Sequence, residues 1–171
     1  MAMITKRPRN SSLRFQTYLD NSDITKTKPE RSLVFGLRKH GGRNAYGRIT
    51  VRHRGGGAYQ KYRIVDFKRL ERDIEGTVKA IEYDPNRNVR LGLVYFLNGA
   101  KSYILLPEGL SVGSTVMAGQ NVEAKTGNCM PIKNIPVGFQ LHNIEVTPGS
   151  GGKIARSAGT SVQLMAKTDD Y

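Results

Sequence analysis

Short apolar segments separated by turn residues predict a chain built almost entirely of β-strands. Each segment is rich in Val, Ile, Tyr and Phe and is bounded by Gly, Pro, Asn or Asp, the residues that usually end strands. The expected strands are residues 48–53, 61–67, 76–83, 89–97 and 101–106. No segment repeats its apolar side chains at the 3.6-residue period of an amphipathic helix, so helix should be minor.

Alternation within the strands predicts which side chains share a face. In the strand 89–97 it places four apolar side chains together: Val89, Leu91, Leu93 and Tyr95. The same rule puts Val78 and Ala80 on one face of the preceding strand. The dipeptide Asn98-Gly99 offers two residues that tolerate positive φ, so we expect a type I′ turn and a tight hairpin here.

The spacing of these strands predicts an all-β fold with a small closed barrel, because closure removes exposed sheet edges. We expect an oligonucleotide-binding-like β-barrel over residues 60–124. Residues 1–59 form a basic N-terminal extension in which residues 1–35 lack any periodicity, so a partner should order them. Residues 125–171 predict a second β module with strands near 139–146 and 161–167. It is short for a complete core, and it ends at a polar turn, 168–171, where a further strand is expected.

The composition adds a strong positive charge, since the chain has 27 Lys and Arg against 14 Asp and Glu, a net charge of +13. The densest part, residues 38–69, holds ten basic residues and one acid among many glycines. Bare glycine backbone can approach another surface closely while guanidinium groups pair with phosphate oxygens, so the expected partner is a nucleic acid. A solvated basic loop is the alternative. The candidate RNA contacts here are Arg43, Arg48, Arg52, His53, Arg54, Lys61, Arg63, Lys68 and Arg69.

Further candidate contacts follow in the second half of the chain. Arg87 lies in a turn that would hold its direction, although a solvated turn cation is an equal alternative on chemistry alone. Lys153 and Arg156 follow the glycine-rich loop 148–152, which favours contact with a nucleic-acid backbone over a plain connecting loop.

Aromatic and acidic side chains near these cations have two possible roles. Tyr59 and Tyr62, flanked by basic residues, are candidates for stacking on unpaired bases. Core positions are expected for three other rings: Phe67, Tyr83 and Tyr95. Asp66 and Asp84 are isolated acids in basic surroundings and should orient arginines.

No constellation for catalysis or metal binding emerges. The single Cys129 excludes an intrachain disulfide, and three separated histidines provide no metal-ligand spacing, so no metal and no cofactor are expected. The glycine-rich loop lacks the first glycine and the Ser or Thr of a Walker motif. His142 and Glu145 should lie on opposite faces of a strand and form no dyad. We therefore expect a protein that is not an enzyme, and with no long apolar run we expect no membrane partner.

Several motifs closely resemble the universal large-subunit ribosomal protein L2 family, in its bacterial or organellar branch. They are GGRN at 41–44, GRITVRHRGGG at 47–57, DFKR at 66–69, IEYDPNR at 81–87, KSYIL at 101–105, HNIE at 142–145 and GGKIARSAGT at 151–160. The resemblance extends in order over residues 31–171. The chain departs from many members at Ala58-Tyr59-Gln60, where they have basic residues, so its grip there should be weaker.

The resemblance implies an oligonucleotide-binding barrel followed by an SH3-like barrel, here incomplete, and direct binding of large-subunit ribosomal RNA. It implies that Arg87 and Arg156 grip RNA where the barrels meet. It further implies neighbouring ribosomal proteins as partners, with roles in subunit association and support of the peptidyl-transferase region. Those roles belong largely to a C-terminal extension with a histidine, which this sequence lacks.

Because the sequence stops inside the SH3-like region, we expect either a separate chain that carries the C-terminal half or a truncation. The expected compartment is an organelle matrix, ahead of the bacterial cytoplasm. The alternative function is a free-standing single-strand RNA-binding module or RNA chaperone, which would need stacking aromatics on an open barrel face.

Overall fold

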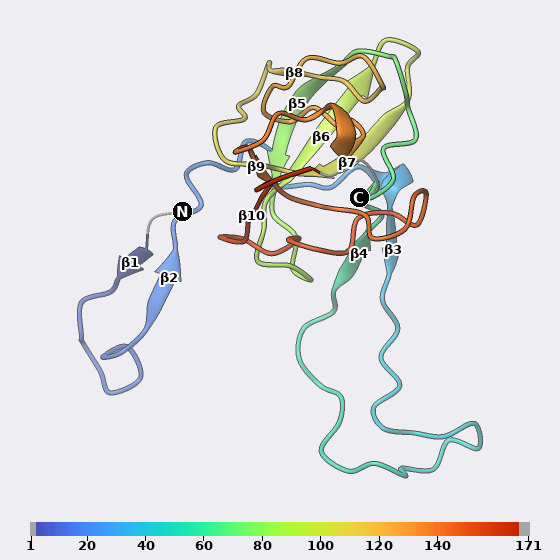
Figure 1. The fold of residues 1–171 in the computed structure, drawn as a ribbon. Helices are drawn as coiled ribbons and strands as arrows, with labels where there is room; N and C mark the ends of the chain where they lie inside the picture. Colours follow the sequence, from blue (N-terminus) through green and yellow to red (C-terminus); the bar gives the residue numbers. More distant parts are fainter. Residues whose placement is uncertain (1–2, 168–171) are drawn as a thin grey trace.

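The computed structural model describes residues 3–167, and nearly all of its regular structure is β-strand (Figure 1). The only helical pieces in this range are two single 3-10 turns, Arg31–Leu33 and Ile132–Asn134. The all-β prediction is therefore confirmed. Within residues 3–167 no helix has the length and apolar character needed to cross a bilayer.

A four-stranded antiparallel sheet forms the centre of the molecule. Its strands are β5 (Gly76–Glu82), β6 (Leu91–Phe96), β7 (Lys101–Leu105) and β8 (Thr115–Val116), arranged in the order β7-β6-β5-β8. The sheet curls as a half-barrel, and a parallel bridge from Val65 to Tyr103 extends it beyond β7. Three of the expected strands, 76–83, 89–97 and 101–106, are confirmed, each with ends within two residues.

Both faces of this sheet are buried, which the simple alternation rule did not predict. One core cluster consists of Val65, Ala80, Leu91, Leu93, Tyr103 and Leu105. The other consists of Val78, Val94, Phe96, Ile104, Leu110 and Val116. Val78 and Ala80 fall in different clusters because the register with β6 shifts between them, so the prediction that they share a face is wrong.

The β6–β7 hairpin exists, but its turn is not type I′. Tyr95 pairs with Lys101, which leaves three residues beyond the flanking Phe96–Ala100 hydrogen bond: Leu97, Asn98 and Gly99. The Gly99 N–H donates to the Phe96 carbonyl at 3.0 Å, and only Gly99 has positive φ. This is the common three-residue loop, a tight turn followed by a left-handed glycine.

A second antiparallel pair, β3 (Val34–Gly36) with β4 (Lys61–Arg63), carries a long loop that projects from the body (Figure 1). The predicted strand 48–53 lies in this loop and is wrong, since Ile49 alone forms a bridge there. Thr50 and Val51 both donate to the Gly42 carbonyl instead of joining a ladder. The predicted strand 61–67 is divided, because β4 ends at Arg63 before Val65 pairs with β7.

The N-terminal part is more ordered than the sequence predicted. A hairpin of β1 (Met3–Thr5) and β2 (Thr17–Leu19) projects from the body. Residues 20–33, which we call the strap, then run back along the sheet, where Thr25 and Lys26 donate backbone hydrogen bonds to the Ile81 carbonyl. Leu33 and Val34 pack on the core. The expectation that residues 1–35 depend on a partner for order is therefore wrong for the strap.

The C-terminal segment, residues 125–167, has little regular structure and few buried residues. Its strands β9 (Gln140–Leu141) and β10 (Val162–Gln163) pair over two residues only, so the expected strands 139–146 and 161–167 are much shorter than predicted. Among residues 125–167 the buried positions are all glycine: Gly127, Gly151 and Gly152. Its backbone bonds to residues next to the main sheet, since the Cys129 N–H donates to the Met117 carbonyl and the Gly152 N–H donates to the Phe67 carbonyl, both at 3.0 Å. The expected polar turn 168–171 lies outside the described residues.

Candidate nucleic-acid interface

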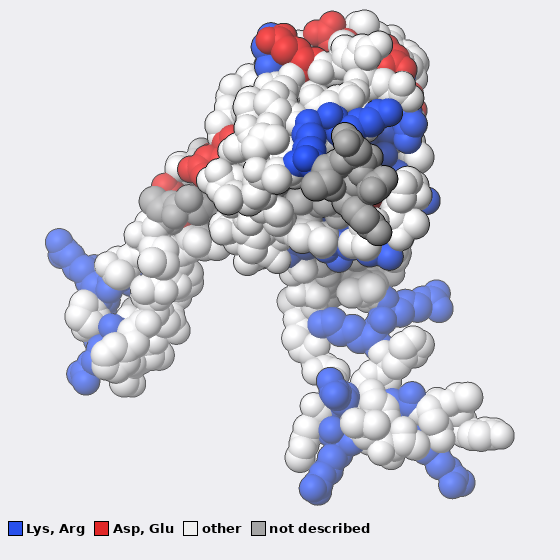
Figure 2. Space-filling model, in the orientation of Figure 1, with Lys and Arg blue, Asp and Glu red and all other residues white. Residues whose placement is uncertain are grey.

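The projecting segment between β3 and β4, residues 37–60, is the most basic part of the surface, and we call it the basic loop. It contains no acidic residue. Its six cations are all exposed: Arg38, Lys39, Arg43, Arg48, Arg52 and Arg54. His53 is exposed as well. In Figure 2 the acidic side chains in view lie on the body, whereas the projecting loop shows only basic ones. Five predicted contact residues, Arg43, Arg48, Arg52, His53 and Arg54, are thus accessible together.

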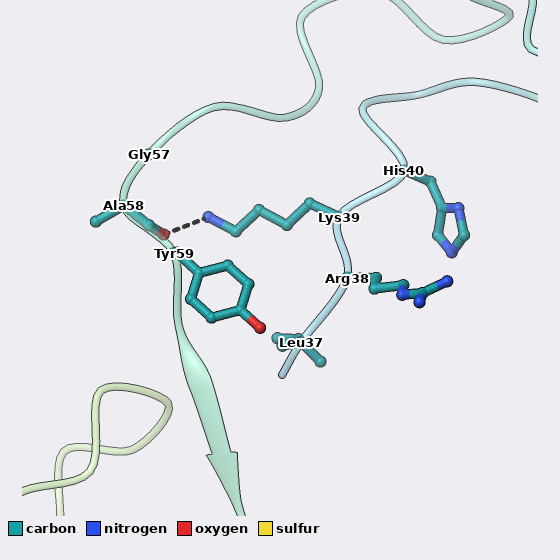
Figure 3. Close-up of a pocket in the computed structure, with 7 residues that line it drawn as sticks. All are labelled: Leu37, Arg38, Lys39, His40, Gly57, Ala58 and Tyr59. Atoms are coloured by element: carbon teal, nitrogen blue, oxygen red, sulfur yellow. Dashed lines mark hydrogen bonds between the residues drawn. The ribbon is translucent and has the colours of Figure 1, made fainter. Parts of the chain in front are cut away.

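The two arms of the basic loop are tied at their base. The Leu37 N–H donates to the Gln60 carbonyl at 3.2 Å. Lys39 Nζ crosses between the arms and donates to the Gly56 and Ala58 carbonyls at 2.8 and 3.0 Å. Figure 3 shows the Tyr59 ring beside this lysine, in a pocket open to solvent. The base of the loop therefore has a defined geometry.

Farther out, a glycine lets the chain approach itself closely. Gly42 has φ of +71°, and a Cβ there would lie 2.1 Å from the Val51 carbonyl oxygen. That oxygen is backbone, so it cannot move aside as a side chain would. A residue other than glycine would displace the outer half of the loop, where Thr50 and Val51 bond to Gly42.

A second cluster lies where the C-terminal segment meets the sheet. Arg87 forms an ion pair with Asp84, which is fully buried, and its Nη2 donates to the Tyr62 hydroxyl at 2.8 Å. The Arg87 guanidinium also lies 5.6 Å from the Phe67 ring centroid, and that of Arg156 lies 4.9 Å from the same ring. We call Arg87, Phe67 and Arg156 the arginine joint. The two arginines singled out in the sequence, 69 positions apart, share one aromatic ring.

The glycine-rich loop before Arg156 does not offer its amides to a ligand. Glu145 accepts hydrogen bonds from the backbone N–H groups of Gly149 and Gly151 at 2.8 and 2.9 Å. Gly152 N–H donates to the Phe67 carbonyl at 3.0 Å. An internal carboxylate and a carbonyl therefore already accept the hydrogen bonds of these amides, and contact of this region with a nucleic-acid backbone stays a prediction for the side chains that follow the loop. The adjacent side chains of Lys153 and Arg156 remain exposed.

Two predicted contact residues are buried. Arg63 is 6% exposed and donates to the Lys61 carbonyl, while Arg69 is 8% exposed and donates to the Gly127 carbonyl at 3.1 Å. Burial lowers the pKa of Arg69. The buried guanidinium groups of Arg63 and Arg69 are not accessible to RNA in this structure. Both residues lie beside the core, where a long basic side chain can point inward as well as outward. Lys61 and Lys68 are exposed.

The predictions for the acidic and aromatic residues are correct for some positions and wrong for others. Asp84 orients Arg87 as expected, but Asp66 accepts backbone N–H groups from the three residues that follow Phe67 and orients no arginine. Phe67 and Tyr95 pack against the core. Tyr83 is 49% exposed, so its core assignment is wrong. The Tyr59 ring is largely exposed, whereas one face of Tyr62 is covered by Arg87 at 4.9 Å.

Burial also shifts the pKa of two titratable groups outside these clusters, Cys129 and His142. Burial raises the pKa of the Cys129 thiol, which keeps it protonated and a poor nucleophile. Burial, with a smaller effect of the Arg69 charge, lowers the pKa of His142 and keeps it neutral. Within residues 3–167 no group of three or more His, Cys, Asp or Glu side chains is placed to hold a metal.

Sequence reasoning missed two features of the candidate interface. Lys39, counted only as a charge, ties the arms of the basic loop. Tyr46 lies at the apex of that loop and is 90% exposed. The available signal was its position, an aromatic residue directly before Gly47 and Arg48 within a charged, glycine-rich stretch.

Comparison with protein families matches most of the chain in two consecutive blocks. Residues 30–118 match the model described as Ribosomal Proteins L2, RNA binding N-terminal domain, and they contain the basic loop and the main sheet. Residues 125–171 match the model described as Ribosomal Proteins L2, C-terminal domain, and they contain the glycine-rich loop and Arg156. The chain therefore belongs to the ribosomal protein L2 family, the RNA-binding proteins of the large ribosomal subunit.

Proposed function

We propose that this chain binds large-subunit ribosomal RNA directly and acts as a structural constituent that helps the RNA to fold, without catalysing a reaction. The observation that carries the proposal is the basic loop, a projection with six exposed cations, no acid and a geometry held by its own backbone. Such a projection has no protein surface to pair with. A folded polyanion that surrounds it would supply the missing counter-charge.

The chemistry favours recognition of RNA shape over recognition of base sequence. Arginine forks form bidentate pairs with phosphate oxygens, and such contacts position a protein without reading bases. The exposed candidates lie on both the loop and the body, so they can follow a folded backbone from two sides. They are Arg43, Arg48, Arg52, His53, Arg54, Lys61, Lys68, Lys153 and Arg156, with the half-buried Arg87 beside them.

The test is a titration of the purified chain against a transcript of large-subunit ribosomal RNA at several salt concentrations. We expect Arg48→Ala, Arg52→Ala and Arg54→Ala together to weaken binding and to lower the slope of log K against log salt by about two to three, because each lost phosphate contact removes nearly one released counterion. A short unstructured RNA serves as the competitor ligand.

The matched control removes three exposed cations from elsewhere on the body, Lys79, Lys125 and Lys133. This triple alanine variant should keep the slope of the wild-type protein. An equal loss of RNA affinity in both variants would mean that binding depends on net charge alone and not on the basic loop. Equal affinity for the structured and the unstructured RNA would favour the single-strand binding module instead.

We extend the proposal to neighbouring ribosomal proteins as partners, and to the support of subunit association and of the peptidyl-transferase region, on family membership alone. A separate chain that carries further C-terminal strands, and an organellar or bacterial ribosome as the location, stay predictions from the sequence. Mass spectrometry of ribosomes purified from each compartment checks both. A second polypeptide carrying L2 C-terminal sequence in the same particle would support the separate chain, and its absence would count against it.

A further inference from the structure

Tyr46 at the apex of the basic loop is almost fully exposed to solvent. At 90% exposure it is the most exposed large apolar or aromatic side chain among residues 3–167. An aromatic ring of this size is normally covered within the protein, because leaving it in water forgoes the free energy of burying its apolar surface. The basic loop projects away from the body (Figure 1), and the described chain leaves the Tyr46 ring uncovered.

The backbone beneath Tyr46 is held in place. Asn44 Oδ1 accepts hydrogen bonds from the N–H groups of Tyr46 and Arg48 at 3.0 and 3.1 Å. The Asn44 N–H donates to the Arg48 carbonyl at 2.9 Å, and the Gly47 N–H donates to the Asn44 carbonyl at 3.0 Å. A bridge between Arg43 and Ile49 closes the turn below. The ring is thus presented on a preformed apex, which lowers the entropy lost when it binds.

The surroundings of Tyr46 indicate what would cover it. Arg43 and Arg48 flank the apex, both exposed, and no acid occurs in the sequence between Glu30 and Asp66. A protein partner would have to match this charge with a dense acidic surface. RNA offers phosphates for the arginines and a planar base for the ring from a single ligand.

We propose that Tyr46 is a stacking residue that takes an unpaired, unstacked base of large-subunit ribosomal RNA, while Arg43 and Arg48 pair with the phosphates on either side. This inference rests on the proposed function and adds a defined contact to it. Bases within an A-form duplex are already stacked on both faces, so the ligand must be a base in a loop, bulge or junction.

The absence of tryptophan from the sequence gives a direct test. Tyr46→Trp places the only indole of the protein at the apex. We expect its fluorescence to be quenched when the large-subunit RNA transcript is added and to stay unchanged with a fully paired RNA duplex. Tyr46→Leu, which keeps an apolar side chain without a π face, should weaken binding of the transcript by about 5- to 150-fold. Its salt slope should equal that of the wild-type protein, since no phosphate contact is lost.

Tyr83→Leu is the matched control, because Tyr83 is a half-exposed tyrosine on the body, and it should bind the transcript as the wild-type protein does. Wild-type affinity in Tyr46→Leu, or an indole signal that RNA does not change, would overturn the stacking role while leaving RNA binding by the loop intact. Failure of the wild-type chain to bind the transcript would instead overturn the proposed function. Tyr46→Phe should behave as the wild-type protein, and a loss as large as in Tyr46→Leu would contradict stacking.

Discussion

At the scale of single residues, a buried polar chain joins the strap to the sheet. The Tyr103 hydroxyl donates to Glu82 at 2.7 Å and accepts the backbone N–H of Glu30 at 2.8 Å. Tyr103 and Glu82 are almost completely buried. Lys26 Nζ approaches the other Glu82 oxygen at 3.6 Å. One hydroxyl therefore bonds to a buried carboxylate and to a partly buried backbone N–H from another part of the chain, which makes it costly to remove.

Tyr103→Phe tests this arrangement. We expect the free energy of unfolding to fall by about 1–3 kcal/mol, because the Glu82 carboxylate and the Glu30 N–H each lose a partner. Urea unfolding followed by circular dichroism measures the loss. Ser102→Ala, on the same strand but with a hydroxyl that has no hydrogen-bond partner, is the control and should cost much less.

The same hydroxyl also predicts how stability depends on pH. Burial, followed by the bond to Glu82, raises the pKa of Tyr103 above its ordinary value near 10. The stabilisation is therefore complete below pH 10 and is lost as the pH rises toward the folded-state pKa. Wild-type protein should lose stability above pH 10 more steeply than Tyr103→Phe. Parallel profiles for the two proteins would contradict this role.

At the scale of elements, Arg90, which directly precedes the inner strand β6, holds the start of the strap against the sheet. It is 5% exposed, and its guanidinium donates to Asp23 at 3.0 Å and to Asp20 and Asn21 at 2.8 Å. These residues lie at the start of the strap, directly after the β1–β2 hairpin. A single buried arginine thus sets where the N-terminal projection leaves the body.

Arg90→Ala should release this end of the strap. We expect a loss of about 1.5–3 kcal/mol in unfolding free energy, since the bonds involve a charged donor. Hydrogen exchange at the Thr25 and Lys26 amides, which bond to the Ile81 carbonyl, should become faster. Lys79→Ala, an exposed change on β5, serves as the control. Unaltered exchange in Arg90→Ala would mean that the backbone bonds hold the strap without the arginine.

At the scale of the whole molecule, the arginine joint links the C-terminal segment to the sheet. Arg87 comes from the turn after β5, and Arg156 follows the glycine-rich loop. Besides sharing the Phe67 ring, these regions are connected by the Ala158 N–H, which donates to Asn88 Oδ1 at 3.2 Å. The C-terminal segment has little core of its own, so this contact surface decides how it is held.

The two arginines of the joint should separate stability from RNA binding. Arg156→Ala removes an exposed cation that lies over the Phe67 ring, so we expect it to weaken RNA binding by about 1–3 kcal/mol with only a small fall in melting temperature. Arg87→Ala leaves the buried Asp84 carboxylate without its ion pair and should in addition lower the unfolding free energy by about 3 kcal/mol. Titration with the RNA transcript and thermal melts distinguish the two. Equal stability loss in both variants would contradict the assignment.

Much of the fold was predictable where the signal is local. The strands 76–83, 89–97 and 101–106 were recognisable from their composition and bounding turns, because β-branched and aromatic residues favour extended backbone wherever they are. The charge of the basic loop was likewise visible, since a long stretch with many cations and no acid cannot pack against itself. The Arg48–His53 segment failed because its amides bond to Gly42 within the loop, a contact that composition does not encode.

The β-rich character, the distribution of charge and the family resemblance are all readable in the amino-acid sequence, because they depend on residue type and short-range order. Which cations face solvent depends on the folded chain, because Arg63 and Arg69 point inward and donate to backbone carbonyls, one two residues away and the other far along the chain. The fold also brings Arg87 and Arg156 to the same Phe67 ring, and it places the Glu145 carboxylate against the amides of the glycine-rich loop. It leaves the Tyr46 side chain exposed to solvent. Each of these depends on the free energy of contacts between distant segments, which no local pattern records.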